Sequence, residues 1–264
     1  MLTADGEAFH DASRETGRQS LAPLLAFDCG ALADQDPLDR PLWLFLTEFQ
    51  RLDTPAAMAD LDGVFCPSDE LAWRIRNEFP ELPVHVTGLP VCSGLFMDED
   101  GDVTRRQLGA EEGQLVVFCR EETAALSQAM DRVMEDERFF LITQEHLRII
   151  DHDPCRATGR ALSACDLMVA EPSAWRLAEA LACNLPVVAW ADTQSPYFQN
   201  ALYLTQHGAG QICQDGLDLV YRLGIFASKP ERIRRLREAV RGLSRTFDAG
   251  QLAKTINQSM ACAA

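Results

Sequence analysis

The most regular feature of the chain is an alternation of short apolar runs with segments in which apolar residues recur at helical spacing. The apolar runs predict buried strands, and between two of them Leu126, Met130 and Val133 repeat as on one face of a helix. The expected strands are residues 24–27, 42–46, 63–66, 84–86, 115–119, 139–143, 147–150, 167–170, 187–190 and 210–213. Alternating strands and helices are typical of an α/β fold with doubly wound sheets.

The segment after the fourth expected strand indicates a domain boundary. Residues 88–92 contain glycine and proline, and residues 97–102 are strongly acidic, which is a composition typical of linkers. We therefore expect two Rossmann-like units, an amino-terminal domain over residues 1–91 and a carboxyl-terminal domain over residues 92–264. The first contains fewer expected strands than a doubly wound domain usually has, so we predict that it is reduced.

The composition of the chain limits the classes of partner and the cellular compartment that we expect. A formal net charge of −16 disfavours nucleic acid and anionic lipid as main partners. No apolar run has the length of a transmembrane segment, and the first residues lack the basic and apolar regions of a secretory signal, so we expect a cytoplasmic protein. The nine cysteines form no Cys-x-x-Cys pair and several lie in apolar runs, which predicts reduced core thiols rather than a disulfide framework or a zinc site.

The sequence also predicts no other metal site. Asp98, Asp100 and Asp102 have the spacing that opens a calcium loop. The twelfth position of that loop would be Gly109, where the ion needs a glutamate, so the loop is incomplete.

The stretch from Ala164 to Gly210 is the most informative part of the chain. An expected strand ends in the turn Glu171-Pro172-Ser173, a helix follows, and a second strand comes next. This is the βαβ unit of a doubly wound sheet, in which ligands bind at the carboxyl ends of the strands and the amino ends of the helices. The pattern therefore predicts a nucleotide-type cleft.

Two segments resemble the family 28 glycosyltransferases, which include the peptidoglycan N-acetylglucosaminyltransferase and the diacylglycerol galactosyltransferases. Residues 62–68 and 86–91, DGVFCPS and VTGLPV, are similar to the segment that closes the amino-terminal domain of that family. The second segment matches its nucleotide-sugar region at Asp166, Glu179-Ala180, Pro186, Asn200-Ala201 and Gly208-Ala209-Gly210.

The resemblance implies the two-Rossmann, or GT-B, fold and an activity. The carboxyl-terminal domain would hold a UDP-sugar, the amino-terminal domain would hold the acceptor, and a hexosyl group would pass to an acceptor hydroxyl by a single inverting displacement. The nucleotide sugar is then the donor substrate, and no cofactor is implied. Glu179 matches the acidic residue that binds the ribose hydroxyls, and a carboxylate suits a vicinal diol because it accepts two hydrogen bonds. The family holds the sugar hydroxyls with residues just before Asn200, where Gln194 or Gln199 is the candidate here, and Asn200 either contacts the sugar or caps and packs the next helix.

The chain departs from the family where the diphosphate would lie. Ser173 and Ala174 replace a pair of glycines, and the turn from Arg120 to Thr123 replaces a second glycine-rich turn. Arg120 is suited to pair a phosphate, and the hydroxyls of Ser173 and Thr123 are possible donors, whereas Glu171 would repel a diphosphate.

The amino-terminal half departs further. The family's glycine-rich opening, which ends in a histidine near the reaction centre, has no counterpart here. Asp53 occupies the position of a second histidine found in the galactolipid enzymes; it is a weak candidate for the general base, and its alternative role is to cap a helix beginning at Thr54-Pro55.

Two functional hypotheses remain open at this point. The first is a UDP-sugar-dependent glycosyltransferase. The second is a catalytically degenerate glycosyltransferase fold that acts as a nucleotide-binding or protein-interaction module. A reduced first sheet leaves an unpaired edge, and such edges invite association, so a second copy of the chain or a partner subunit is expected to complete it.

Overall fold

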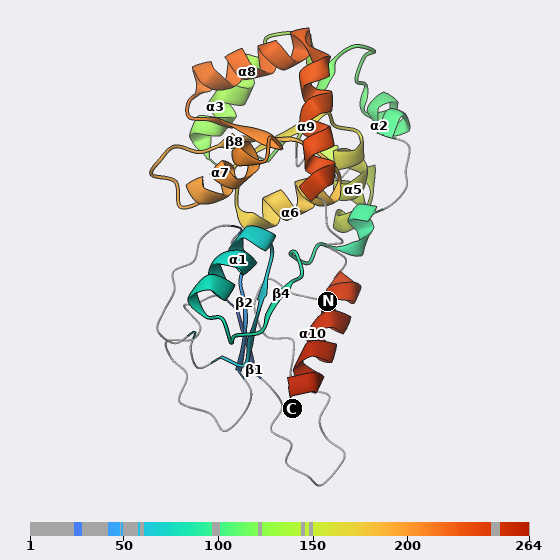
Figure 1. Cartoon of the computed structure of the whole chain (residues 1–264). Coiled ribbons are helices and arrows are strands. Elements are labelled where there is room, and N and C mark those ends of the chain that lie inside the picture. The colour runs from blue at the N-terminus through green and yellow to red at the C-terminus, as the bar shows by residue number, and fades with distance from the viewer. Residues whose placement is uncertain are drawn as a thin grey trace.

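The computed structural model describes residues 24–27, 42–47, 49, 58, 61–96, 101–120, 123–143, 146–147, 150–243 and 249–263. In these ranges the chain forms two α/β units, and the carboxyl-terminal helix lies beside the first of them (Figure 1). Each unit is built around its own parallel sheet.

The first unit has strands that follow chain order across the sheet, β1-β2-β3-β4. Its elements are β1 (Leu24–Phe27), β2 (Leu42–Phe45), β3 (Gly63–Cys66), α1 (Asp69–Glu78) and β4 (Val84–Val86). Every residue of β3 is buried, because α1 packs Leu71 and Ile75 against one face and aromatic residues cover the other. Ser68 begins α1: its hydroxyl accepts the Leu71 N–H and donates to the carbonyl of Phe49 at 2.7 Å.

The connector η3 (Ser93–Phe96) leads into the second unit, whose sheet has the order β6-β5-β7-β8-β9. Its strands are β5 (Leu115–Cys119), β6 (Phe139–Ile142), β7 (Leu167–Ala170), β8 (Val187–Trp190) and β9 (Gly210–Cys213). Its helices are α2 (Gly101–Leu108), α3 (Ala124–Val133), α5 (Pro154–Ser163), α6 (Ala174–Ala182), α7 (Phe198–Gln206), α8 (Gly216–Ser228) and α9 (Pro230–Leu243). The direction of winding reverses between β5 and β7, as in doubly wound folds.

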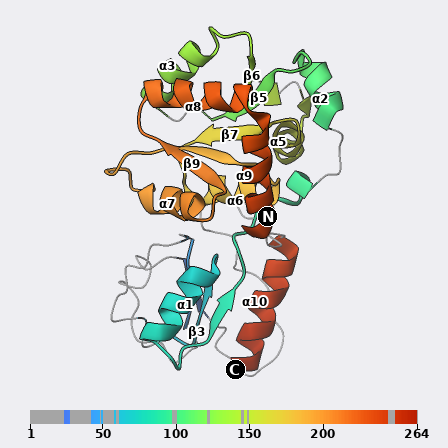
Figure 2. The ribbon, with the colours of Figure 1, turned by 45° about the horizontal axis from the view of Figure 1, so that its top comes forward.

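Helices cover both faces of the second sheet, which explains why β5 and β7 are apolar throughout (Figure 2). The helices α3 and α8 pack on one face, and α5, α6 and α7 pack on the other. The second of these cores continues into the first unit, where it includes Trp43 and Phe65, whose rings stack with centroids 5.0 Å apart. The helix α10 (Ala249–Ala263) contributes Leu252 to the same core.

The α/β class predicted from the pattern is confirmed, as are the strands at 24–27, 63–66, 84–86, 115–119, 167–170, 187–190 and 210–213. The strand predicted at 147–150 is wrong, because Leu147 and Ile150 lie in helical turns. Their spacing of three residues puts both side chains on one side of a helix, and Leu147 is buried there. A short apolar run does not by itself distinguish these two structures.

The expectation that the cysteines are all reduced is also wrong. Cys92 and Cys155 form a disulfide, and their Cα atoms are 6.2 Å apart. The two residues are separated by 63 positions in the chain and meet only because η3 packs against the first turn of α5. Sequence spacing contains no signal for such a contact.

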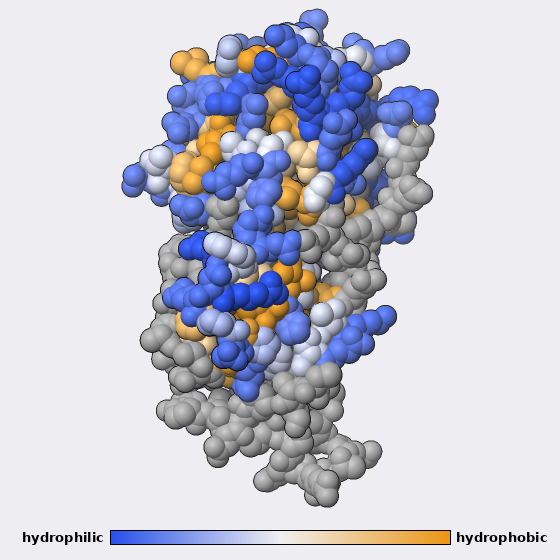
Figure 3. Space-filling view, viewed as in Figure 1, coloured by the Kyte–Doolittle hydropathy of each residue, from blue (hydrophilic) through white to orange (hydrophobic). Residues whose placement is uncertain are grey.

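The surface of the described part is polar on the face drawn in Figure 3, most continuously over the second unit. None of its helices combines the length and the apolar character that crossing a membrane would require.

Candidate functional site

The carboxyl ends of β5 and β7 lie where the winding of the second sheet reverses, which is where doubly wound folds bind their ligands. Arg120 directly follows β5. The turn Glu171-Pro172-Ser173 follows β7 and leads into α6. The fold therefore brings two of the segments selected from the sequence to one edge of the sheet.

Two arginines and a glutamate meet at this edge and form what we call the arginine–glutamate cluster, Arg120, Arg176 and Glu179. The Arg120 Nη1 lies 3.4 Å from Oε2 of Glu179, and the Arg176 Nη1 lies 3.2 Å from the same oxygen. Between 21% and 23% of each side chain is exposed, so the cluster is only partly open to solvent. Arg176 and Glu179 are both on α6, one turn apart.

The cluster leaves capacity for a ligand. Both arginines use Oε2 of Glu179, and within the described residues Oε1 has no hydrogen-bond partner. Two guanidinium groups meet one carboxylate in the cluster. Such a set suits phosphate oxygens, while Oε1 suits a hydroxyl.

Ser173 and Ala174 lie at the start of α6 and have different surroundings. Ser173 occupies the N-cap position, but its side chain makes no capping hydrogen bond, and it is half-buried. Its hydroxyl and the first N–H groups of a nine-residue helix face the same end, a combination that favours anions. Ala174 is buried in the core and offers only its backbone.

Thr123 and Gln199 each lie at the start of a helix. Thr123 is the N-cap of α3, and its side chain accepts the Leu126 N–H at 3.3 Å. Gln199 is exposed in the first turn of α7. Asp53, the candidate base, lies outside the described residues.

Asn200 is fully buried at the contact between the two units. Its Nδ2 donates to the carbonyl of Pro172 at 3.1 Å, and its Oδ1 accepts the Phe49 N–H at 3.2 Å. The side chain thus joins the turn after β7 to a segment of the first unit. Its role in this structure is to hold these backbone segments together.

Asp166, the other acidic residue of the matching segment, also supports the framework. Its carboxylate accepts hydrogen bonds from Arg105 at 2.8 Å and from the Val116 N–H at 2.9 Å, at the start of β7 and away from the carboxyl end of that strand. Arg237 of α9 approaches the same carboxylate at 3.8 Å.

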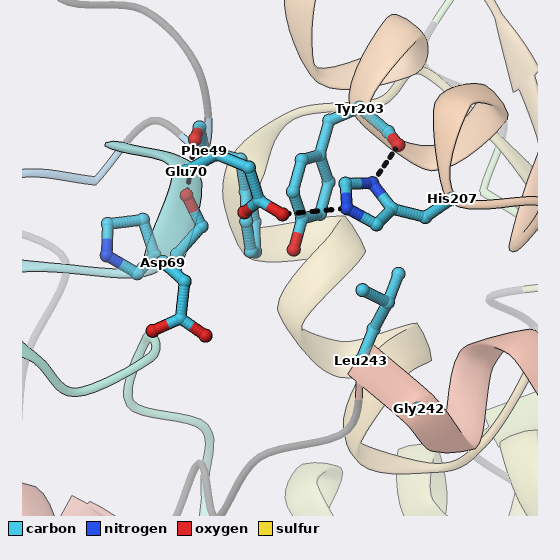
Figure 4. Close-up of a pocket in the computed structure, with 9 residues that line it drawn as sticks. Phe49, Asp69, Glu70, Tyr203, His207, Gly242 and Leu243 are labelled. Carbon is cyan, nitrogen blue, oxygen red and sulfur yellow. Dashed lines mark hydrogen bonds and ion pairs between the residues drawn. The ribbon is translucent and has the colours of Figure 1, made fainter. Parts of the chain in front are cut away.

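A hollow of about 240 Å³ lies beside the contact between the units, lined by Phe49, Pro67, Ser68, Asp69, Glu70, Tyr203, His207, Gly242 and Leu243 (Figure 4). Glu70 of α1 is 2.7 Å from Nε2 of His207, whose Nδ1 lies 2.8 Å from the carbonyl of Tyr203. The rings of Phe49 and Tyr203 stack at 5.0 Å. Burial, with a smaller contribution from the charge of Glu70, raises the pKa of the Tyr203 hydroxyl.

The described residues contain no group of three or more His, Cys, Asp or Glu side chains suited to hold a metal ion. The sequence interpretation selected Arg120 and Glu179 separately, and the fold brings them together. It missed Arg176. The signal was present, since an arginine three residues before Glu179 on an expected helix lies on the same side of that helix.

Comparison with known proteins gives matches at the level of structure. No family model and no curated protein sequence matches the chain. Among solved structures, MurG of Acinetobacter baumannii is 13% identical with a TM-score of 0.56, over 84% of this chain and 67% of that one. A UGT2 of Phytolacca americana, solved with UDP-2-fluoro-glucose and pterostilbene, is 12% identical with a TM-score of 0.56, over 84% of this chain and 72% of that one. The spinosyn rhamnosyltransferase SpnG, solved with thymidine diphosphate, is 16% identical with a TM-score of 0.56, over 89% and 72%.

These neighbours share an architecture of two Rossmann-like units. At identities of this size the likeness establishes the fold and leaves the substrates open. The chain therefore has the GT-B fold.

Proposed function

We propose that the chain binds a nucleotide diphosphate sugar at the edge formed by β5 and β7, and that it transfers a hexosyl group from a UDP-sugar to an acceptor hydroxyl. The observation on which this proposal depends is the arginine–glutamate cluster at the reversal of the sheet. The resemblance of residues 62–91 and 164–210 to family 28 supports an assignment near that family.

In this proposal the diphosphate occupies the space between the start of α6 and the arginines. Arg120 and Arg176 neutralise the negative charge that grows on the diphosphate as its bond to the anomeric carbon breaks, which is the usual way a site lowers the barrier to such a step. Ser173 and the first N–H groups of α6 supply hydrogen bonds to the same oxygens, and Oε1 of Glu179 accepts from the ribose hydroxyls.

The acceptor oxygen attacks the anomeric carbon from the side opposite the diphosphate, so the configuration inverts. Its proton must pass to a base, for which Asp53 remains the candidate from sequence. We further propose that the reaction takes place in the cytoplasm and that a second copy or a partner subunit completes the acceptor side.

A binding module without turnover is the second candidate function. Asn200, which follows the sugar-contacting region of the resemblance, is fully buried and bonded to Pro172 and Phe49. A module of this kind would keep nucleotide binding through the arginine–glutamate cluster and lose the contacts that orient the sugar.

Calorimetry with three probes tests the binding part of the proposal. We expect Glu179→Gln to weaken the binding of uridine and of UDP by roughly tenfold or more, because each hydrogen bond to a charged group contributes about 1.5–3 kcal/mol. The same substitution should leave the binding of inorganic pyrophosphate intact. Arg120→Gln and Arg176→Gln should weaken the binding of UDP and of pyrophosphate and leave the binding of uridine unchanged.

Asp218→Asn is the matched control, since it removes a carboxylate that pairs with Arg222 at 2.8 Å on α8, outside the site. If no probe binds the wild-type protein, the proposed site is wrong. UDP release from UDP-sugars in the presence of acceptor alcohols then separates transfer from binding alone.

A further inference from the structure

The connector between the units is fastened to the second unit by the disulfide. Cys92 directly precedes η3, and Cys155 lies in the first turn of α5. The two elements also approach closely, since a Cβ on Gly159 would lie 2.5 Å from the carbonyl oxygen of Gly94. Residues 87–91 therefore connect β4 to this fixed point, and Leu89 and Val91 among them are buried in the core.

The other cysteines of the described part have thiols of low reactivity. Five of them form no disulfide, and all but one of the five are fully buried: Cys66, Cys119, Cys165, Cys183 and Cys213. Burial raises the pKa of Cys165 well above its usual value and raises the pKa of Cys183 and of Cys213 to about 12. Thiols of this kind supply little thiolate at neutral pH, so they neither attack disulfides nor oxidise readily.

The disulfide is more accessible than the four fully buried thiols. Cys92 and Cys155 are half-buried, and the residues just before Cys155, at 152–154, are exposed. The free thiol of Cys183 contacts the same turn, with its sulfur 3.8 Å from the carbonyl oxygen of Leu95. A disulfide beside a free thiol, in a chain with several other free thiols, differs from the disulfide framework of a small secreted domain.

We propose that Cys92 and Cys155 form a reversible thiol–disulfide site that takes a dithiol reductant and sets how firmly the connector is held to the second unit. A thiolate of the dithiol attacks one of the two sulfurs, the S–S bond breaks, and a mixed disulfide forms. The second thiol of the reductant then attacks that mixed disulfide and leaves as an oxidised dithiol. Two electrons and two protons pass to Cys92 and Cys155, which become thiols.

Reduction has a local structural consequence. The turn 93–96 then loses its covalent link to α5 and keeps its packing on that helix and the contact of Leu95 with Cys183 at the end of α6, so residues 87–96 gain mobility. The contact through Phe49 and Asn200, on other segments, is unchanged. The inference concerns the connector and does not depend on which ligand the cleft binds.

Thiol trapping on the folded, full-length protein tests the chemistry. The protein is exposed to increasing reduced dithiothreitol without denaturant, or to oxidised glutathione, and its thiols are then blocked with N-ethylmaleimide and located by mass spectrometry. We expect Cys92 and Cys155 to gain label together under dithiothreitol and to lose it together under oxidised glutathione, while the buried thiols stay unlabelled. A pair that opens only after denaturation, or never closes, overturns the proposal.

Hydrogen exchange tests the consequence. Reduced wild-type protein and the Cys92→Ser variant should both exchange amide protons faster over residues 87–96, with exchange in β5, β7 and β8 unchanged. Cys183→Ser is the matched control, because it removes a thiol that contacts the same turn and leaves the pair intact. Equal exchange over residues 87–96 in oxidised and reduced protein would mean that the bond does not restrain the connector.

Discussion

Asn200 and Glu179 come from the same segment of resemblance, yet their side chains have different surroundings. Both polar ends of the Asn200 amide are bonded to backbone groups inside the protein, whereas Glu179 keeps one oxygen without a partner among the described residues. At the residue scale, the hydrogen bonds that each side chain already makes show that Asn200 stabilises the cleft, whereas Glu179 is available to a ligand.

Asn200→Asp should destabilise the protein by about 1–3 kcal/mol. The substitution replaces the N–H donor that faces the Pro172 carbonyl with an acceptor, and it does so at a position that is 0% exposed. Urea unfolding measures the change. Gln199→Ala, one residue earlier and exposed, is the control and should stay within about 0.5 kcal/mol. A loss as small as that of the control would show that Asn200 does not hold the two segments.

His85 should make folding less stable in mild acid. Burial, and then the charge of Arg76, lower the pKa of His85 below its ordinary value of 6.5. The unfolded chain therefore binds a proton before the folded protein does, and stability falls as the pH drops through about 6.5. Urea midpoints between pH 7.5 and 5.5 should fall less steeply for His85→Gln than for the wild type. Parallel slopes would contradict this assignment.

Individual residues of the candidate site could be predicted from the sequence only where the residue type suited the ligand and the position matched the expected strand ends and helix starts. Arg120 and Glu179 were selected because their residue types suit phosphate and ribose at the expected positions, and the fold places them 3.4 Å apart. The buried state of Asn200 was only partly foreseeable, because it depends on Phe49, which is 151 residues away. The disulfide depends on an equally distant contact, and no local pattern encodes it.

At the scale of elements, the period of the apolar pattern predicted most strands because a parallel sheet covered on both faces requires uninterrupted apolar runs. The same rule failed at 147–150, where Leu147 and Ile150 lie in helical turns although the apolar run is equally short. The order of the strands, and with it the position of the reversal between β5 and β7, follows from packing between elements rather than from the sequence of any one of them.

Asp166→Asn should destabilise the second unit by about 1–3 kcal/mol, because three elements converge on its carboxylate. It accepts from Arg105 of α2 and from the first part of β5, and it faces Arg237 of α9, whose pKa burial lowers. Urea unfolding should show the loss.

Asp218→Asn is the comparison for this prediction. Its partner Arg222 is four residues away on the same helix, where both side chains are partly exposed, so the expected loss is only about 0.3–0.5 kcal/mol. Equal losses in the two variants would mean that Asp166 does not join the elements.

At the scale of the whole molecule, the described contact between the two units combines a stacked aromatic pair with an ion pair. Phe49 is 1% exposed and stacks on Tyr203, while Glu70 and His207 are 43% and 27% exposed. Burying an aromatic ring contributes several kcal/mol, whereas an exposed ion pair contributes about 0.2–1 kcal/mol. Packing should therefore outweigh charge in holding the units together.

Phe49→Ala and Glu70→Ala test this ranking directly. Removing the ring should cost about 3–5 kcal/mol and speed amide exchange in α7, since the cavity opens against Tyr203. Removing the carboxylate should cost less than about 1 kcal/mol and leave α7 protected. Urea unfolding and hydrogen exchange measure both variants under the same conditions. If Glu70→Ala is as damaging as Phe49→Ala, the ion pair visible in Figure 4, rather than the aromatic stack, dominates the contact between the units.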